Sequence, residues 1–203
     1  MSSYDDLIHT SASLENQELA EEAPAKPKRF LDYLSLALTT FGVGYVPLAP
    51  GTWGSAVGVL IYLLFRRIEF YSAGYFANQN WQGEQVSAWI HVLNAVLLLL
   101  FSFAGIWAAN RATVLFRDKD PQQAVVDEVI GQLITFLFVP FAISGWLIFA
   151  GFLLFRLFDV WKPYPINSLQ NLPAGLGVCA DDILAGAYAG ICLAAIYAVN
   201  LTV

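Results

Sequence analysis

Long apolar runs separated by short polar stretches dominate the pattern of this chain after residue 29. Residues 87–110 carry no formal charge and exceed the roughly 20 residues that a membrane-spanning helix needs. Further helices are predicted from the apolar runs at residues 30–40, 53–65, 129–155 and 183–199. No segment shows the strict alternation of apolar and polar residues that is typical of a half-buried strand. The pattern therefore predicts an all-α fold, a polytopic membrane helical bundle.

Helix-breaking residues interrupt this pattern at two places. Residues 42–55 are rich in glycine and proline and cannot form a regular helix throughout. Pro140 and Ser144-Gly145 interrupt the apolar run at 129–155. The 27 residues of this run reach about 40 Å as a helix, whereas two crossings of the membrane need about 60 Å. We therefore predict that the run forms a broken or re-entrant helical hairpin.

The charges that flank the apolar runs predict the orientation of the chain in a membrane. Residues 68–85 are polar and aromatic, which suits a loop or an interfacial segment, and residues 111–123 are predicted to form a charged loop. With the N-terminus inside, most Lys and Arg residues lie inside and only Arg66 and Arg67 lie outside, as the positive-inside rule requires. Every residue with candidate chemistry then falls on the cytoplasmic face of a multi-pass protein.

Composition supports a membrane protein and divides the chain in two. Charged residues make up 13% of the sequence, against roughly 25% in average soluble chains. The formal net charge of −6 comes entirely from residues 1–22, and residues 24–29 are basic. We predict a disordered acidic tail with a basic juxtamembrane end over residues 1–29, and a membrane-embedded domain over 30–203. The balanced remainder offers no basic patch, which excludes nucleic acid as a partner.

Carboxylates in apolar surroundings are the main candidates for chemistry, because such charges are costly and are usually retained for function. They occur at three places far apart in the sequence, which are Asp127-Glu128, Asp159 and Asp181-Asp182. Several carboxylates together suit a hard cation such as Mg2+. Structural roles are the alternatives, since acids in the first turn of a helix match its dipole and a member of the last pair can serve as an N-cap.

Two cations beside the middle acid are candidates for binding a phosphate. Arg156 and Lys162 flank Asp159 at i, i+3 spacing, which places all three on one face of a helix. Cations next to carboxylates suit a phosphoryl group that is bound through a metal ion. The alternative is a salt-bridged helix end at the membrane interface.

The Gly51–Ser55 turn at the start of the first predicted span is a further candidate. Free backbone N–H groups at a helix N-terminus bind anions, and glycines such as Gly54 allow close approach. Thr52 and Ser55 add hydroxyl donors. A plain turn followed by a helix cap explains this sequence equally well.

Four motifs that contain these residues resemble phosphatidylglycerophosphatase A, in order and over about residues 33–200. The motifs are FGVGYVPLAPGTWGS at 41–55, VDEVIG at 126–131, FRLFDVWKPYP at 155–165 and GLGVCADDILAG at 175–186. The resemblance implies a bacterial, Mg2+-dependent enzyme of the inner (cytoplasmic) membrane. It also implies that the enzyme removes the terminal phosphate of phosphatidylglycerophosphate to give phosphatidylglycerol. The acidic tail and the long 68–85 segment depart from the family pattern.

We therefore expect a lipid phosphatase with Mg2+ as its cofactor and phosphatidylglycerophosphate as its substrate. The expected metal ligands come from Asp127, Glu128, Asp159, Asp181 and Asp182. The expected catalytic residues are Asp127, Glu128, Asp159 and Asp182. The expected ligands of the substrate phosphate are Arg156, Lys162, Thr52, Gly54 and Ser55. The sequence leaves the nucleophile open between a water and an aspartyl carboxylate, and it leaves the oligomeric state open.

A non-enzymatic membrane protein is the alternative function. A small channel or transporter with a cation site also carries acids among apolar helices. That function predicts acids spread through the depth of the bilayer, whereas a lipid phosphatase predicts them together at one face.

Overall fold

The computed structural model describes residues 29–202 except 78, 80, 119, 120, 171 and 173. Apart from Arg29, the predicted acidic tail lies outside the described residues. The regular elements of the described chain are all helical, as the sequence predicts. They are α2 (Phe30–Thr40), the 3-10 turn η1 (Val43–Tyr45), α3 (Pro50–Ala77), α4 (Gly83–Phe116), α5 (Val126–Phe136), α6 (Gly145–Trp161), α7 (Ile166–Leu169) and α8 (Ala174–Thr202).

Helix α2 has the predicted bounds and lies against α4. It ends because Phe41 adopts a left-handed conformation with φ of 47° and donates its N–H to the carbonyl of Ala37. Asp32 is buried on α2 and forms an ion pair with Arg111 of α4, with 2.5 Å between Oδ1 and Nη2. This pair explains why α4 continues past its predicted end at residue 110, since Arg111 has a partner while it stays helical.

Helices α3 and α4 extend further along the chain than the sequence analysis predicts. Helix α3 covers 28 residues and includes residues 68–77, which the sequence analysis placed in a loop or interfacial segment. Pro50 begins this helix because a proline N–H is not needed at the first helical position. Helix α4 covers 34 residues and includes residues 111–116 of the predicted charged loop. The charged residues of these two stretches, Glu69 and Arg111, are only partly buried, so a helix can include them.

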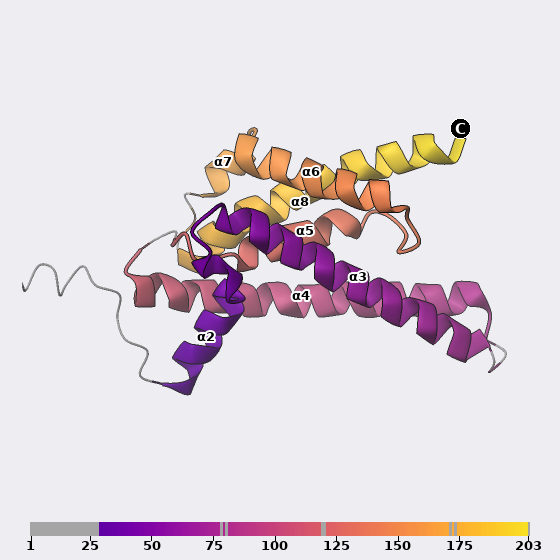
Figure 1. Ribbon diagram of the computed structural model, residues 1–203, viewed down its shortest axis with the longest axis horizontal. Helices are drawn as coiled ribbons and strands as arrows, with labels where there is room; N and C mark the ends of the chain where they lie inside the picture. The colour runs from indigo at the N-terminus through magenta and orange to yellow at the C-terminus, as the bar shows by residue number, and fades with distance from the viewer. Residues whose placement is uncertain are drawn as a thin grey trace, which may run out of the picture.

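The predicted interruption of the run at 129–155 is confirmed. Helix α5 ends at Phe136, α6 begins at Gly145, and the chain reverses between them (Figure 1). The hydroxyl of Tyr62 on α3 donates to the carbonyl of Phe141, which fixes this turn against the bundle. With 11 residues, α5 is only about 16 Å long, which is too short to cross a membrane. The depth of this hairpin in a bilayer stays a prediction.

Helices α4 and α8 are long and apolar enough to cross a membrane. Large apolar side chains of α4, among them Leu93, Val96, Leu100 and Phe103, are exposed on the surface of the bundle. A core helix of a soluble protein would bury such residues, whereas a helix in a bilayer turns them toward lipid. The chain is therefore a membrane-associated helical protein.

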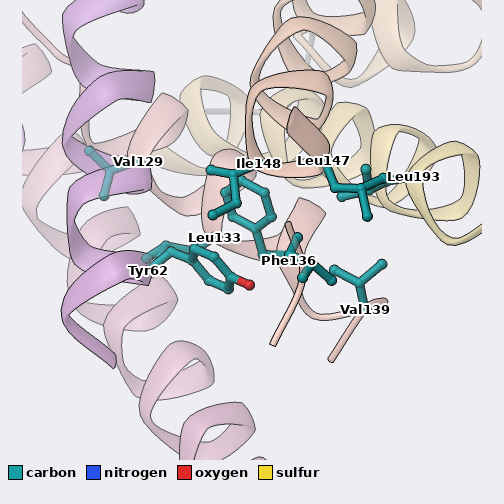
Figure 2. Packing of buried hydrophobic residues seen from close by; sticks show 9 residues of the cluster. Tyr62, Val129, Leu133, Phe136, Val139, Leu147, Ile148 and Leu193 are labelled. Carbon is teal, nitrogen blue, oxygen red and sulfur yellow. The ribbon is translucent and has the colours of Figure 1, made fainter. Parts of the chain in front are cut away.

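The short helix α5 is the centre of the fold. The main apolar cluster packs around it and draws on α3, α5, the turn after α5, α6 and α8 (Figure 2). Its buried members are Tyr62, Val129, Leu133, Phe136, Val139, Ile143, Leu147, Ile148 and Leu193. Because α5 is enclosed on these sides, its first turn has a single position relative to the neighbouring helix ends.

Helices α5 and α8 cross at two glycines. A Cβ atom on Gly186 would lie 2.3 Å from the carbonyl oxygen of Gly131, so only hydrogen atoms fit between the two backbones. The hydroxyl of Thr135 donates to the carbonyl of Gly186 at 3.3 Å and ties the helices together. This close crossing sets the separation of the acids that α5 and α8 carry.

Candidate active site

Five helix ends gather at one end of the bundle, at the left of Figure 1. They are the starts of α3, α5 and α8 and the ends of α4 and α6. A cavity of about 1150 Å³ lies between them. The five predicted acids come from three of these helices, and all of them line the cavity, namely Asp127, Glu128, Asp159, Asp181 and Asp182. Side chains that are far apart in the sequence thus meet in one place.

Asp127, Glu128 and Asp182 form the closest group of carboxylates. One oxygen atom of each lies within 4.8 Å of the others. Asp127 and Asp182 are buried, and Asp127 Oδ1 and Glu128 Oε2 have no hydrogen-bond partner among the described residues. Ligand oxygens of an octahedral Mg2+ are about 2.9 Å apart at adjacent positions and about 4.2 Å apart at opposite positions, so the three carboxylates would move closer together on binding one ion. The group fits a small divalent cation.

Electrostatics in this group also favours a cation. Burial raises the pKa of Asp127, and the neighbouring Glu128 and Asp182 carboxyls raise it further. Burial likewise raises the pKa of Glu128; a hydrogen bond from Asp127 opposes this effect and the charge of Asp159 adds to it. The cause is the same for both groups, since negative charges crowd together away from water. A divalent cation would remove this repulsion and hold the carboxyls in their ionised form.

Asp159 lies at the end of α6 and is paired with two cations, as its spacing predicts. Arg156 Nη1 lies 2.5 Å from Asp159 Oδ2, and Lys162 Nζ lies 3.9 Å from Oδ1. Lys162 also forms an ion pair and a hydrogen bond with Asp181 of α8. Burial acts to lower the pKa of Lys162, but the hydrogen bond and charge of Asp181 outweigh it and raise that pKa. Lys162 is therefore a cation held at the cavity wall.

Asp181 and Asp182 do not begin a helix, in contrast to the N-cap alternative. Helix α8 starts at Ala174, so both acids lie two turns inside it. Adjacent helical residues point about 100° apart. Asp182 therefore turns toward Asp127 and Glu128, while Asp181 turns toward Lys162. The two acids have different surroundings although both line the cavity.

The predicted phosphate-binding turn is placed differently. Thr52 is exposed and its N–H donates to the carbonyl of Ala49, and none of Thr52, Gly54 and Ser55 lines the cavity. The backbone donors of this turn are used inside the helix because α3 already begins at Pro50. Ser55 is buried, donates to the carbonyl of Gly51 at 2.9 Å and accepts from Arg156 at 3.4 Å. It contacts the guanidinium group that pairs with Asp159.

Gly51 belongs to the predicted turn, but its contact with the acids of the site was not predicted from the sequence. A Cβ atom on Gly51 would lie 2.2 Å from Glu128 Oε1 and 3.0 Å from Arg156 Nη1. One turn further, a Cβ on Gly54 would lie 2.8 Å from Cβ of Val125. The signal for this contact was the i, i+3 spacing of the two glycines, which leaves one face of α3 without side chains. Helix α3 thereby approaches the start of α5 closely.

The fold and this cavity define a class: a membrane-associated helical protein with clustered carboxylates and paired cations, suited to a divalent cation and a phosphoryl group. The family model described as phosphatidylglycerophosphatase A matches residues 36–197. The chain therefore belongs to the phosphatidylglycerophosphatase A family, and it is a phosphatase of phospholipid metabolism.

Individual relatives support this assignment. A Bacteroides thetaiotaomicron protein named "Putative phosphatidylinositol-3-phosphatase" is 38% identical over 157 residues, which are 77% of this chain and 88% of that protein. Phosphatidylglycerophosphatase A of Escherichia coli is 31% identical over 147 residues, or 72% of this chain and 73% of that protein. The Haemophilus influenzae protein of the same name is 28% identical over 183 residues, or 88% of this chain and 97% of that protein. No solved structure matches the chain.

Proposed function

We propose that this protein hydrolyses the terminal phosphate of phosphatidylglycerophosphate to give phosphatidylglycerol, and that it depends on Mg2+. The observation that carries the proposal is the convergence of Asp127, Glu128 and Asp182 beside Asp159 and Lys162 in one cavity. The relatives named phosphatidylglycerophosphatase A support this substrate.

Each group in the cavity has a defined part in this proposal. Asp127, Glu128 and Asp182 would hold Mg2+, which supplies stabilisation of the negative charge that develops on phosphoryl oxygens. Lys162 lines the cavity and donates hydrogen bonds to the phosphate. Asp159 pairs with both Arg156 and Lys162 through its two oxygens. Lys162 lines the cavity and Arg156 does not, so Asp159 would orient Lys162 toward the phosphate while Arg156 braces Asp159 from behind.

Asp181 positions Lys162 from the opposite wall. Its Oδ2 atom accepts the hydrogen bond from Lys162, and its Oδ1 atom has no partner among the described residues. In the metal site predicted from sequence, Asp181 was one of five possible ligands. The geometry favours Asp181 as a support for the phosphate-binding lysine, with the metal held by Asp127, Glu128 and Asp182.

The location of the cavity suits a lipid substrate. Its lining includes Val114 and Arg117 at the end of α4, a helix long enough to cross a membrane. A headgroup can enter the cavity there while its acyl chains stay in the bilayer. We further propose a multi-pass protein of the bacterial inner membrane with this cavity on the cytoplasmic face, because the flanking Lys and Arg residues favour that orientation.

A phosphoinositide is the second candidate substrate, because the relative at 38% identity bears the name of a phosphatidylinositol-3-phosphatase. The chemistry at the site is the same, since both headgroups end in a phosphomonoester. The channel or transporter alternative is not favoured, because it predicts acids at several depths and the five acids line one cavity at one end of the bundle.

Phosphate release by the purified full chain tests the proposal. The substrates are phosphatidylglycerophosphate, phosphatidylinositol 3-phosphate and phosphatidic acid in detergent micelles, with Mg2+ or with EDTA. We expect the fastest release from phosphatidylglycerophosphate and none in EDTA. Asp127→Asn should abolish release, whereas Glu84→Gln, an exposed carboxylate at the far end of α4, should not change it. Activity in EDTA, or faster release from the inositol lipid, would contradict the proposed cofactor or substrate.

A further inference from the structure

The cavity is larger than a phosphate and a metal ion require. Its volume of about 1150 Å³ exceeds the roughly 300–1,000 Å³ of typical small-molecule sites. The five acids and Lys162 occupy the walls formed by α5, α6 and α8. The rest of the lining mixes apolar residues with the polar residues Thr113, Arg117, Asp118, Gln122 and Gln170. We refer to these polar residues as the second wall.

Arg117 is the cation of the second wall. Among the described residues that line the cavity, Lys162 and Arg117 are the two with positive charge, and they come from the ends of α6 and α4. Arg117 adopts a left-handed conformation with φ of 55°, and its N–H donates to the carbonyl of Thr113. This turn ends α4 and places Arg117 in the lining of the cavity.

The depth of Arg117 in the bilayer matches that of the phosphodiester of a phospholipid. It directly follows a helix that is apolar and long enough to cross a membrane, and cations at the end of a span lie among the lipid headgroups. The phosphodiester of a phospholipid lies at this depth, next to the glycerol backbone. Both candidate substrates carry such a diester and a terminal monoester, so they have two anionic groups at separate positions.

We propose that Arg117 binds the phosphodiester of the lipid substrate, while Lys162 and the metal site bind the terminal monoester. Arg117 is then a specificity residue that selects headgroups with two phosphates. Gln122 and Gln170 on the same wall can accept hydrogen bonds from headgroup hydroxyls through their amide oxygens. The inference rests on the proposed function, because it assigns the second half of the same substrate.

Product inhibition separates the two phosphate positions. Hydrolysis of phosphatidylglycerophosphate in mixed micelles is measured with two inhibitors, a short-chain phosphatidylglycerol, which has only the diester, and orthophosphate, which mimics only the monoester. Arg117→Gln should raise the inhibition constant of phosphatidylglycerol about tenfold, the loss expected for one charge-assisted hydrogen bond, and leave that of orthophosphate unchanged. The same variant should raise KM about tenfold with kcat within about twofold.

Two further variants serve as controls. Arg117→Lys keeps the charge and should recover most of the affinity for phosphatidylglycerol. Arg29→Gln removes the same charge from a residue that does not line the cavity, and it should leave both inhibition constants unchanged.

The outcomes are distinct. Unchanged inhibition by phosphatidylglycerol in Arg117→Gln, or equal weakening of both inhibitors, overturns the assignment of Arg117 to the diester. An equal effect of Arg29→Gln also overturns it, because general attraction of anionic lipid would then be sufficient. If the wild-type protein releases no phosphate from phosphatidylglycerophosphate, the proposed function itself fails and takes this assignment with it.

Discussion

The contact between Gly51 and Glu128 leads to a sharp prediction about the site. In Gly51→Ala, the new Cβ atom would lie 2.2 Å from Glu128 Oε1, compared with about 3.5 Å for an ordinary contact. The carboxylate must therefore move by about 1 Å. Mg2+ tolerates little distortion of its ligands, and a misplacement of about 1 Å can lower the rate about 100-fold. We expect kcat to fall by about that factor and the Mg2+ requirement to rise.

Stability should change in the opposite sense to activity. Gly51 has no left-handed backbone conformation that alanine would strain, and alanine favours a helix over glycine by up to about 1 kcal/mol. The side chain of Glu128 can rotate away from the new methyl group, so the fold has no need to open. We expect the thermal midpoint of Gly51→Ala to stay equal to or above that of the wild type.

The measurement is phosphate release as a function of Mg2+ concentration, together with a thermal scan of each protein in detergent. Gly74→Ala is the matched control, because Gly74 lies in the same helix with nothing within 4 Å of the added Cβ. Gly74→Ala should keep full activity. Wild-type activity in Gly51→Ala would refute the reasoning. It would mean that the Glu128 carboxylate does not lie against Gly51 in the active protein.

Three further predictions concern the metal site and the crossing that holds it. Asp182→Asn removes a proposed metal ligand and should lower kcat at least about 100-fold, more than the loss of a residue that only supports a ligand. Asp181→Asn releases Lys162 and should mainly raise KM. Equal effects of the two variants in a steady-state assay would contradict their separate roles. Mg2+ at about 100 times its dissociation constant should stabilise the protein by about 2.7 kcal/mol, or roughly 5–10 °C in a thermal scan, and Asp182→Asn should lose this shift. Gly186→Ala should destabilise the protein by about 1–3 kcal/mol, because the added Cβ meets backbone of α5 at 2.3 Å; an unchanged midpoint in the same scan would refute this crossing.

The helical architecture could be predicted from the sequence because long apolar runs and helix breakers act locally. Helix α2 and the break between α5 and α6 have the predicted positions, since left-handed turns, proline and glycine end helices through their own backbone. The predicted loop was wrong at residues 111–116, and at residues 68–77 the loop alternative was wrong while the interfacial alternative stays a prediction. There the outcome depended on partners such as Asp32 for Arg111, which lie far away in the sequence.

The candidate site was predictable in its residue types but not in its division of roles. Acids in apolar segments are costly, so their presence alone indicated a common function for all five. The sequence could not distinguish Asp181 from Asp182, because their difference is the direction in which α8 turns each side chain. The predicted phosphate-binding turn illustrates the same limit, since the start of α3 decided whether its N–H groups were free.

The sequence by itself determined that this is a helical membrane-associated protein with a small set of unavoidable charges, because hydropathy and residue spacing are properties of the chain alone. The tertiary structure decided which charges share a site. The glycine crossing of α5 with α8 and the bare face of α3 at Gly51 bring three carboxylates within 4.8 Å of one another. Such distances depend on how closely backbones approach in space, and no local pattern of residues specifies that.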